Sequence, residues 1–262
     1  MPPEEPGSAA LGADWLRAPW HGERVGALMS TRTGGASVPP WASLNLGDHV
    51  GDDPRAVAAN RAAFARAIGA TPVFLRQVHG TRLARVGRAD TLAGAEAHEA
   101  DACLTAEPGI ACCVLVADCL PILLAAPAGR AVAAAHAGWR GLAAGVAEAA
   151  LAALCETASC DPAEVAAWLG ACIGPRRFEV GSDVLEAFGA EPPGCFAPAP
   201  VREGRARWHA DLAGLARARL GACGVREITG GAWCTANDAG RFYSFRRDGT
   251  TGRMAAAVWI AG

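Results

Sequence analysis

The stretch Ala111-Cys112-Cys113-Val114-Leu115-Val116-Ala117-Asp118-Cys119-Leu120-Pro121-Ile122-Leu123-Leu124-Ala125-Ala126-Pro127-Ala128 decides the fold of this chain. It is the most apolar segment, but Asp118, Pro121 and Pro127 interrupt it. A charge and two prolines do not suit a membrane helix, whereas short apolar runs bounded by turn residues are typical of buried strands. The stretch therefore predicts two core strands joined by a turn, and no membrane span.

Further apolar runs flank this pair on both sides. Together with it they predict six strands with little helix between them: Val73–Gln77, Leu83–Val86, Ala102–Thr105, Ile110–Ala117, Pro121–Ala126 and Ala131–His136. Elsewhere we expect strands at Val25–Thr31, Val165–Leu169, Val225–Ile228 and Met254–Ile260, and helices at Pro54–Ile68, Leu142–Cys155, Ser182–Phe188 and His209–Leu220. Strands and helices are mixed rather than alternating, which favours an α/β sandwich of mixed sheets over a doubly wound parallel sheet.

No linker divides the sequence, so we expect one α/β domain over residues 1–262, with residues 1–20 as a poorly ordered N-terminal extension. Met1–Gly7 is acidic and rich in proline, unlike a secretory signal, and this favours a cytoplasmic protein. Ala190–Pro200 is rich in proline and glycine and predicts an excursion or a lid. We expect a monomer.

The composition excludes several classes of function. The net charge of −2 gives no basic surface for nucleic acid, and a small anionic ligand fits the local arginine clusters better. Lysine is absent from the sequence, which excludes a lysine Schiff base. Ten cysteines at irregular spacing indicate reduced thiols, most of them small core residues rather than metal ligands.

Three residues of metal-binding type follow predicted strands at turns that contain glycine or proline. They are His79 in Gln77-Val78-His79-Gly80, Cys119 in Ala117-Asp118-Cys119-Leu120-Pro121, and His136 in His136-Ala137-Gly138-Trp139-Arg140-Gly141. Two imidazoles and one thiolate could occupy three corners of a tetrahedral zinc site and leave the fourth corner for water or substrate. Each residue alone is more often part of a core, so the prediction rests on their shared context. His49 is a further candidate pocket residue.

The chain resembles the YfiH-type, or laccase-domain, family, once called polyphenol oxidases. The resemblance covers nearly the whole chain and is carried by these three motifs and by four others: Ser30-Thr31-Arg32-Thr33-Gly34-Gly35, Ser43-Leu44-Asn45-Leu46-Gly47-Asp48-His49-Val50-Gly51-Asp52-Asp53, Ile173-Gly174-Pro175 with Phe178-Glu179-Val180-Gly181, and Ser244-Phe245-Arg246-Arg247-Asp248-Gly249. Two departures are Ala171, where proline is frequent in the family, and Ala236-Asn237, where a Tyr-Ser or Tyr-Thr pair is common.

This resemblance implies a four-layer α/β/β/α sandwich with mixed sheets, related to the catalytic domain of cytotoxic necrotizing factor. It implies Zn²⁺ on His79, Cys119 and His136, with copper possible in the same site. It also implies a purine nucleoside phosphorylase that acts with phosphate on adenosine, inosine, guanosine and methylthioadenosine, and that has adenosine deaminase activity in the same pocket.

Phosphorolysis needs an anion site, for which arginine forks are well suited. Arg32, Arg246 and Arg247 are the candidates, although an Arg-Arg pair can equally be a solvated turn. Asn45 could bind a ribose hydroxyl or phosphate, or only satisfy its own turn. Deamination needs a proton shuttle, and because the zinc deaminase signature is absent, Asp118 and Glu179 are the candidates for it.

Three alternatives stay open. Cys119 could be a nucleophile, with His136 or His79 as base, in a hydrolase acting on an amide or a peptidoglycan precursor. A copper-dependent phenol oxidase is less compatible with the sequence, because a trinuclear copper cluster usually draws on His-X-His pairs and none occurs. A binding factor with a vestigial site is disfavoured by the intact ligand set.

Overall fold

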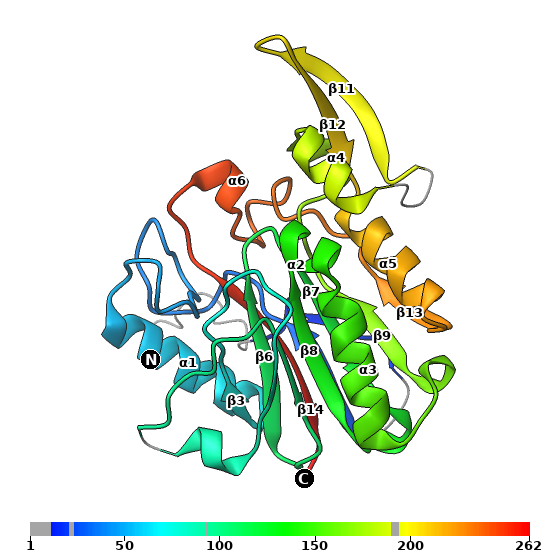
Figure 1. The fold of residues 1–262 in the computed structure, drawn as a ribbon. Coiled ribbons are helices and arrows are strands. Elements are labelled where there is room, and N and C mark those ends of the chain that lie inside the picture. Colours follow the sequence, from blue (N-terminus) through cyan, green and yellow to red (C-terminus); the bar gives the residue numbers. More distant parts are fainter. Residues whose placement is uncertain (1–11, 21–23, 93, 190–193) are drawn as a thin grey trace.

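The computed structural model describes residues 12–20, 24–92, 94–189 and 194–262 (Figure 1). Its helices are α1 (Pro54–Ile68), α2 (Trp139–Ala144), α3 (Val146–Ala158), α4 (Ser182–Phe188), α5 (Leu212–Ala222) and α6 (Phe245–Asp248). Its strands are β1 (Leu16–Arg17), β2 (Val25–Met29), β3 (Thr71–Val73), β4 (Leu83–Arg85), β5 (Ala102–Thr105), β6 (Ile110–Val116), β7 (Leu120–Ala125), β8 (Val132–Ala137), β9 (Ala166–Leu169), β10 (Glu179–Val180), β11 (Phe196–Arg202), β12 (Arg205–Ala210), β13 (Glu227–Gly230) and β14 (Met254–Ile260).

The strands form two large mixed sheets and one small sheet. The order is β1-β2-β14-β6-β3 in the five-stranded sheet and β13-β9-β7-β8-β5-β4 in the six-stranded sheet. Each combines parallel and antiparallel pairs: β3 is parallel to β6 whereas β14 is antiparallel to it, and β13 is parallel to β9 whereas β7 is antiparallel to it. The predicted mixed α/β fold is therefore confirmed at this level.

Strand β6 shows why the apolar stretch belongs to the centre of the molecule. All seven of its residues are buried, as expected of a strand covered on both faces. Val114 and Val116 pack with Leu123 and Trp168 of the six-stranded sheet. The alternate residues Cys113 and Leu115 belong to the cluster that contains Phe64 of α1. Because side chains alternate between the two faces of a strand, β6 packs one face against the six-stranded sheet and the other face against α1.

Helices α3 and α5 cover the six-stranded sheet on the side away from α1 (Figure 1). Leu151 and Leu154 of α3 pack in one cluster with Ile122 and Leu124 of β7. Strands β11 and β12 form a hairpin that projects from this body and pairs with β10 (Figure 1). Of the helices within the described ranges, none is long and apolar enough to cross a membrane.

The structure confirms the predicted first and last residues of several elements. Helix α1 begins after the N-cap Asp53, which accepts a hydrogen bond from the backbone N–H of Arg55, and ends at Gly69 with φ of 66°. Strands β5 and β14 and helix α4 have the predicted bounds. In each case local chemistry, a cap or a continuous apolar run, marks the boundary.

Other predictions need correction. The helix expected over Leu142–Cys155 is two helices, because Gly145 has φ of 98° and interrupts the helical path. His209 belongs to strand β12 rather than to a helix, which begins only after the N-cap Asp211. The strand expected at Val73–Gln77 is Thr71–Val73 instead.

Two predicted irregular segments fall only partly within the described residues. Of the expected extension, residues 1–11 lie outside the described part, and within that part Leu16 and Arg17 form β1 and pair with β2. Of the expected excursion, residues 190–193 lie outside it, and the remainder includes strand β11.

Candidate metal centre and its cavity

The structure brings His79, Cys119 and His136 together. Their potential ligand atoms all lie within 4.8 Å of one another, and His79 Nε2 lies 3.8 Å from Cys119 Sγ. The two imidazole rings meet edge to face, with centroids 4.8 Å apart. His79 follows β3, Cys119 lies in the turn from β6 to β7, and His136 lies on β8. These segments converge because β7 pairs with β8 and places Pro121 opposite His136.

Unusual backbone conformations at His79 and next to Cys119 orient these ligands toward one another. His79 has φ of 62° and Asp118, next to Cys119, has φ of 100°, values that L-residues adopt only where the surrounding structure enforces them. Gly138 leaves the space that the site needs. A Cβ atom there would lie 2.8 Å from His79 Cδ2 and 3.1 Å from Cys119 Sγ. The glycine of the His136-Ala137-Gly138 motif is therefore required by close packing against two ligands.

One buried carboxylate, Asp101, organises two of the three ligands. Its Oδ1 accepts hydrogen bonds from His136 Nδ1 at 2.8 Å and from the backbone N–H of His79 at 2.9 Å. Its Oδ2 accepts from the backbone N–H groups of Val78 at 3.1 Å and Gly80 at 2.7 Å. Burial raises the pKa of Asp101, but the hydrogen bonds from His136, Gly80 and Val78 outweigh it and lower that pKa overall. An ionised Asp101 holds one proton of His136 on Nδ1, so Nε2 is the nitrogen that can bind a metal, which displaces any proton there.

The donor set fits a zinc ion. With Zn–S of about 2.3 Å and Zn–N of about 2.0 Å, a tetrahedral site places sulfur and nitrogen ligands about 3.5 Å apart, close to the 3.8 Å between Cys119 and His79. Burial raises the pKa of the Cys119 thiol, but His136 and His79 outweigh it and lower that pKa to about 6. Burial likewise lowers the pKa of His136, whereas Cys119 and Asp101 raise it to about 9. At neutral pH Cys119 is thus a thiolate, the form that binds metals.

The three ligands open onto a cavity of about 490 Å³, within the size range of small-molecule sites. Its other described lining includes three arginines and three aromatic side chains: Arg140, Arg246, Arg253, Trp139, Phe178 and Phe245. Asp118 is the one carboxylate among the described lining residues, and His49 also lines the cavity, as predicted. Three cations against one carboxylate favour an anionic ligand next to the metal position.

Among the predicted substrate residues, Arg246 lines the cavity and the others do not. The guanidinium of Arg32 lies over the ring of Tyr243, 4.7 Å from its centroid, and donates to the carbonyl oxygens of Ala42 and Ala239. Arg247 forms an ion pair with Asp248 at 2.7 Å. Both side chains hold loops together, and this placement does not support contact with phosphate.

Asn45 and Glu179 also lie outside the cavity lining. The side chain of Asn45 is fully buried and satisfied: its Oδ1 accepts from the backbone N–H groups of Gly47 and Arg253, and its Nδ2 donates to Asp52 Oδ2. The carboxylate of Glu179 forms an ion pair with Arg202. Asn45 therefore joins its own loop to the backbone of Arg253, and Glu179 is not placed to shuttle protons in this cavity.

Sequence reasoning missed Asp101 and Arg253. Asp101 directly precedes β5, and Arg253 directly precedes β14, so each lies where a predicted strand begins. That position is the only signal the sequence offers, because the partners of both residues come from distant segments. The predicted proton carrier Asp118 does line the cavity, where Oδ1 accepts from Thr235 Oγ1 at 2.5 Å and Oδ2 from the backbone N–H of Arg246 at 2.7 Å.

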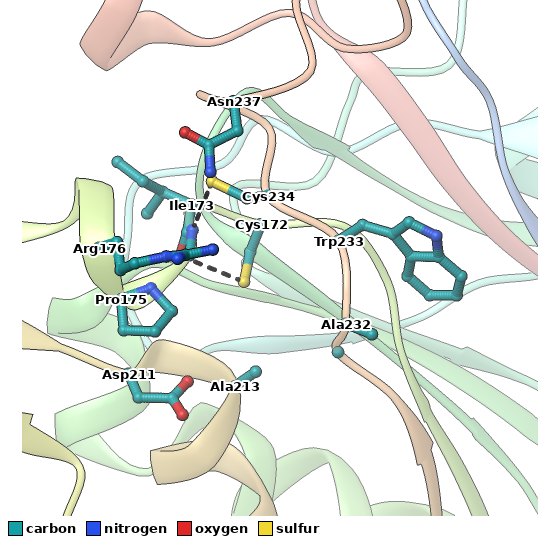
Figure 2. Close-up of a pocket in the computed structure, with 12 residues that line it drawn as sticks. Cys172, Ile173, Pro175, Arg176, Asp211, Ala213, Ala232, Trp233, Cys234 and Asn237 are labelled. Carbon is teal, nitrogen blue, oxygen red and sulfur yellow. Dashed lines mark hydrogen bonds between the residues drawn. The ribbon is translucent and has the colours of Figure 1, made fainter.

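A smaller cavity of about 170 Å³, drawn in Figure 2, shares Ile173 with the lining of the first. It presents the thiols of Cys172 and Cys234, and the carboxylate of Asp211, which is engaged in capping α5 through the backbone N–H of Gly214. Its described lining contains no histidine. Burial raises the pKa of Cys172, so this thiol stays protonated at neutral pH, unlike Cys119. The cavity therefore offers neither a ligand set nor an activated nucleophile.

Comparison with known proteins agrees with this geometry. The sequence model of the family described as multi-copper polyphenol oxidoreductase laccase matches residues 26–261. The chain belongs to this family. A Pseudomonas aeruginosa relative named purine nucleoside phosphorylase PA4543 is 46% identical over 250 residues, which cover 94% of this chain and 98% of the relative. An Escherichia coli relative named purine nucleoside phosphorylase YfiH is 46% identical over 241 residues, covering 90% and 94% of the two chains.

Solved structures of the laccase family share the fold. The Neisseria meningitidis protein NMB0706 superposes with a TM-score of 0.85 at 42% identity, over 95% of this chain and all of the other. YlmD from Geobacillus stearothermophilus superposes with a TM-score of 0.84 at 35% identity, over 95% and 96% of the two chains. The family resemblance predicted from the motifs is thereby confirmed.

Proposed function

We propose that this protein is a zinc-dependent purine nucleoside phosphorylase, acting on adenosine, inosine, guanosine and methylthioadenosine, with adenosine deaminase activity in the same cavity. One observation carries the proposal: the His79-Cys119-His136 set opens onto an arginine-bearing cavity. The relatives named purine nucleoside phosphorylase, matched over almost their whole length, support the choice of substrate class.

Phosphorolysis of a nucleoside breaks the bond between ribose C1′ and the base nitrogen, and forms a bond from a phosphate oxygen to C1′. The base leaves with the bonding electrons and takes up a proton, while positive charge develops on the ribose. A phosphate held beside C1′ both supplies the nucleophile and stabilises that charge. Zinc bound by the three ligands would supply a Lewis acid with one open position.

Different residues of the cavity bind the anion, contact the purine and transfer the proton. The arginines of the cavity bind and orient the anion, because a guanidinium presents paired N–H donors to phosphate oxygens. Trp139, Phe178 and Phe245 offer apolar surfaces for the purine. Asp118, the one carboxylate of the described lining, is the candidate to relay a proton to the leaving base.

Zinc is proposed in preference to copper. The site has two imidazoles and one thiolate, a set that either ion accepts, but the sequence has no His-X-His pair for the additional copper cluster of a multicopper oxidase. A copper-dependent phenol oxidase therefore lacks the ligands its chemistry needs.

We further propose that residues 1–262 form one domain with α/β/β/α layers, related to the catalytic domain of cytotoxic necrotizing factor, and that the protein is a cytoplasmic monomer. The packing of α1 against the five-stranded sheet and of α3 against the six-stranded sheet supports the layer order. Superposition on that toxin domain tests the relation, and sedimentation equilibrium tests the monomer.

The function is tested with purified protein of known metal content. Adenosine and inosine are incubated with and without phosphate, and free base and ammonia are measured separately. We expect adenine and hypoxanthine to be released only when phosphate is present. We expect ammonia to be released from adenosine and not from inosine. His79→Ala, Cys119→Ala and His136→Ala should each abolish activity and most bound zinc, because three ligands leave no redundancy. Full activity in any of these variants would remove that residue from the site.

A second candidate is a Cys–His hydrolase acting on an amide or a peptidoglycan precursor. The 3.8 Å distance between Cys119 Sγ and His79 Nε2 favours it, because a nucleophile and a base within reach of each other are its minimum requirement. A metal-free protein that is inert to nucleosides, and that hydrolyses an amide until iodoacetamide blocks Cys119, would establish this function instead.

A further inference from the structure

The cavity contains three arginines, and they differ in what already occupies their guanidinium groups. The guanidinium of Arg140 lies over the ring of Trp139, 4.4 Å from its centroid. Arg246 lies over Phe178, 5.4 Å from its centroid, and its Nη1 donates to the carbonyl oxygen of Glu179 at 3.0 Å. The guanidinium group of each of these two arginines thus lies over an aromatic ring of the cavity lining.

Arg253 is placed differently, at the end of the five-stranded sheet where β14 begins next to the last residue of β6. It directly precedes β14, in which Met254 pairs with Val116 of β6. Extension of this antiparallel register by one residue sets Arg253 opposite Ala117, two residues from Cys119. The strand pairing therefore brings the guanidinium into the same cavity as the ligand set.

A dedicated loop holds Arg253 in this position. The backbone N–H of Arg253 donates to Asn45 Oδ1 at 2.8 Å, and its carbonyl oxygen accepts from the N–H of Leu46. A Cβ atom on Gly47 would lie 2.8 Å from Arg253 Cγ, so the absence of a side chain there leaves room for the arginine stem. The segment Asn45-Leu46-Gly47, of which Asn45 was predicted as a substrate contact, supports this arginine.

The charge of Arg253 has no carboxylate partner among the described residues. Its Nη1 donates to the carbonyl oxygens of Thr251 and Gly252, both at 3.1 Å, and no ion pair is formed. Burial lowers the pKa of Arg253, whereas Cys119 and Asp118 raise it. A half-buried cation is normally paired, and one that instead faces a cavity is suited to an anionic ligand.

We propose that Arg253 is the main phosphate-binding residue of the site, and that Asn45 and Gly47 are positioning residues that hold it. This inference rests on the proposed phosphorylase function and adds the residue that recognises the second substrate. Orthophosphate bound by Arg253 lies beside the metal position, where the ribose must be attacked.

The test compares Arg253→Gln with Arg246→Gln and Arg140→Gln, all loaded with zinc. Zinc content and the circular dichroism spectrum establish that each variant is folded. At saturating inosine, the KM for phosphate should rise about tenfold or more in Arg253→Gln, because a charge-assisted hydrogen bond to phosphate is lost. The rise should be smaller in the other two variants.

Gly47→Ala provides a second variant that keeps the charge but displaces the arginine stem, and it should also raise the KM for phosphate. An unchanged KM in Arg253→Gln, or a larger rise in Arg246→Gln or Arg140→Gln, would overturn the assignment. Equilibrium dialysis with labelled orthophosphate separates this inference from the function itself. If the wild type binds phosphate, Arg253→Gln does not, and no nucleoside is cleaved, then the phosphorylase proposal fails while the anion site stands.

Discussion

Substitution of Asp101 by asparagine removes one charge from the support of the metal centre and keeps the shape of the side chain. The carboxylate of Asp101 accepts four hydrogen bonds, two on each oxygen. The amide of asparagine has one oxygen, so it keeps at most two of them, and its NH₂ group faces two N–H donors. In one orientation His136 and the backbone of His79 lose their acceptor, and in the other Val78 and Gly80 lose theirs.

Loss of two hydrogen bonds to a charged, fully buried group predicts a decrease of about 3 kcal/mol or more in the free energy of unfolding. Because Asp101 also orients His136, zinc affinity should fall about 10- to 100-fold. Urea unfolding measures the first quantity, and competition with a chromophoric chelator measures the second. Asp90→Asn is the matched control, since Asp90 also accepts from a histidine, His98 Nε2 at 2.7 Å, and from a backbone N–H, that of Gly87.

The control should bind zinc like the wild type. If Asp101→Asn is folded and binds zinc with wild-type affinity, then the carboxylate does not orient the ligands, and the reasoning from its hydrogen bonds is wrong.

Two further predictions concern Tyr243 and Gly138. Burial raises the pKa of Tyr243, so the phenol stays neutral in the folded state, whereas in the unfolded state it ionises near pH 10. The free energy of unfolding should therefore fall above that pH by up to about 1.4 kcal/mol per pH unit. The variant Tyr243→Phe should lack this contribution to the slope. Tyr243 is the single tyrosine of the chain, so absorbance at tyrosinate wavelengths should rise only with unfolding, and a titration near pH 10 in the folded protein would contradict this. Gly138→Ala places a Cβ atom 3.1 Å from Cys119 Sγ and should weaken zinc binding in the chelator assay. The control Gly221→Ala, with no atom within 4 Å of the new Cβ, should bind zinc like the wild type. Equal zinc affinities of the two variants would refute the packing argument.

The sequence predicts those elements whose boundaries are encoded locally. Helix α1 has its N-cap, its proline and its terminal glycine within seventeen positions, and strand β6 is a continuous apolar run. The projecting hairpin was missed because β11 and β12 are largely exposed and carry prolines and arginines instead of an apolar pattern. The break at Gly145 was missed because one glycine in an Ala/Leu-rich segment does not decide between a helix that continues and one that ends.

The candidate site was likewise predictable from the sequence only in part. His79, Cys119 and His136 were found because each lies at or after the end of a predicted strand in a motif with a turn residue, and the structure brings them together. Arg32 and Arg247 are chemically as suitable for phosphate as Arg253, and only tertiary structure shows that their guanidinium groups are occupied elsewhere. The choice among arginines depends on burial and partners, which a sequence does not contain.

The central claim is that the zinc-loaded site transfers the ribosyl group of a purine nucleoside to phosphate. The most direct measurement is ³¹P NMR of the reaction of inosine with orthophosphate, catalysed by the zinc-loaded protein. The account predicts a ribose 1-phosphate signal that grows in proportion to hypoxanthine. Release of hypoxanthine together with free ribose, or no reaction with zinc bound, would contradict it.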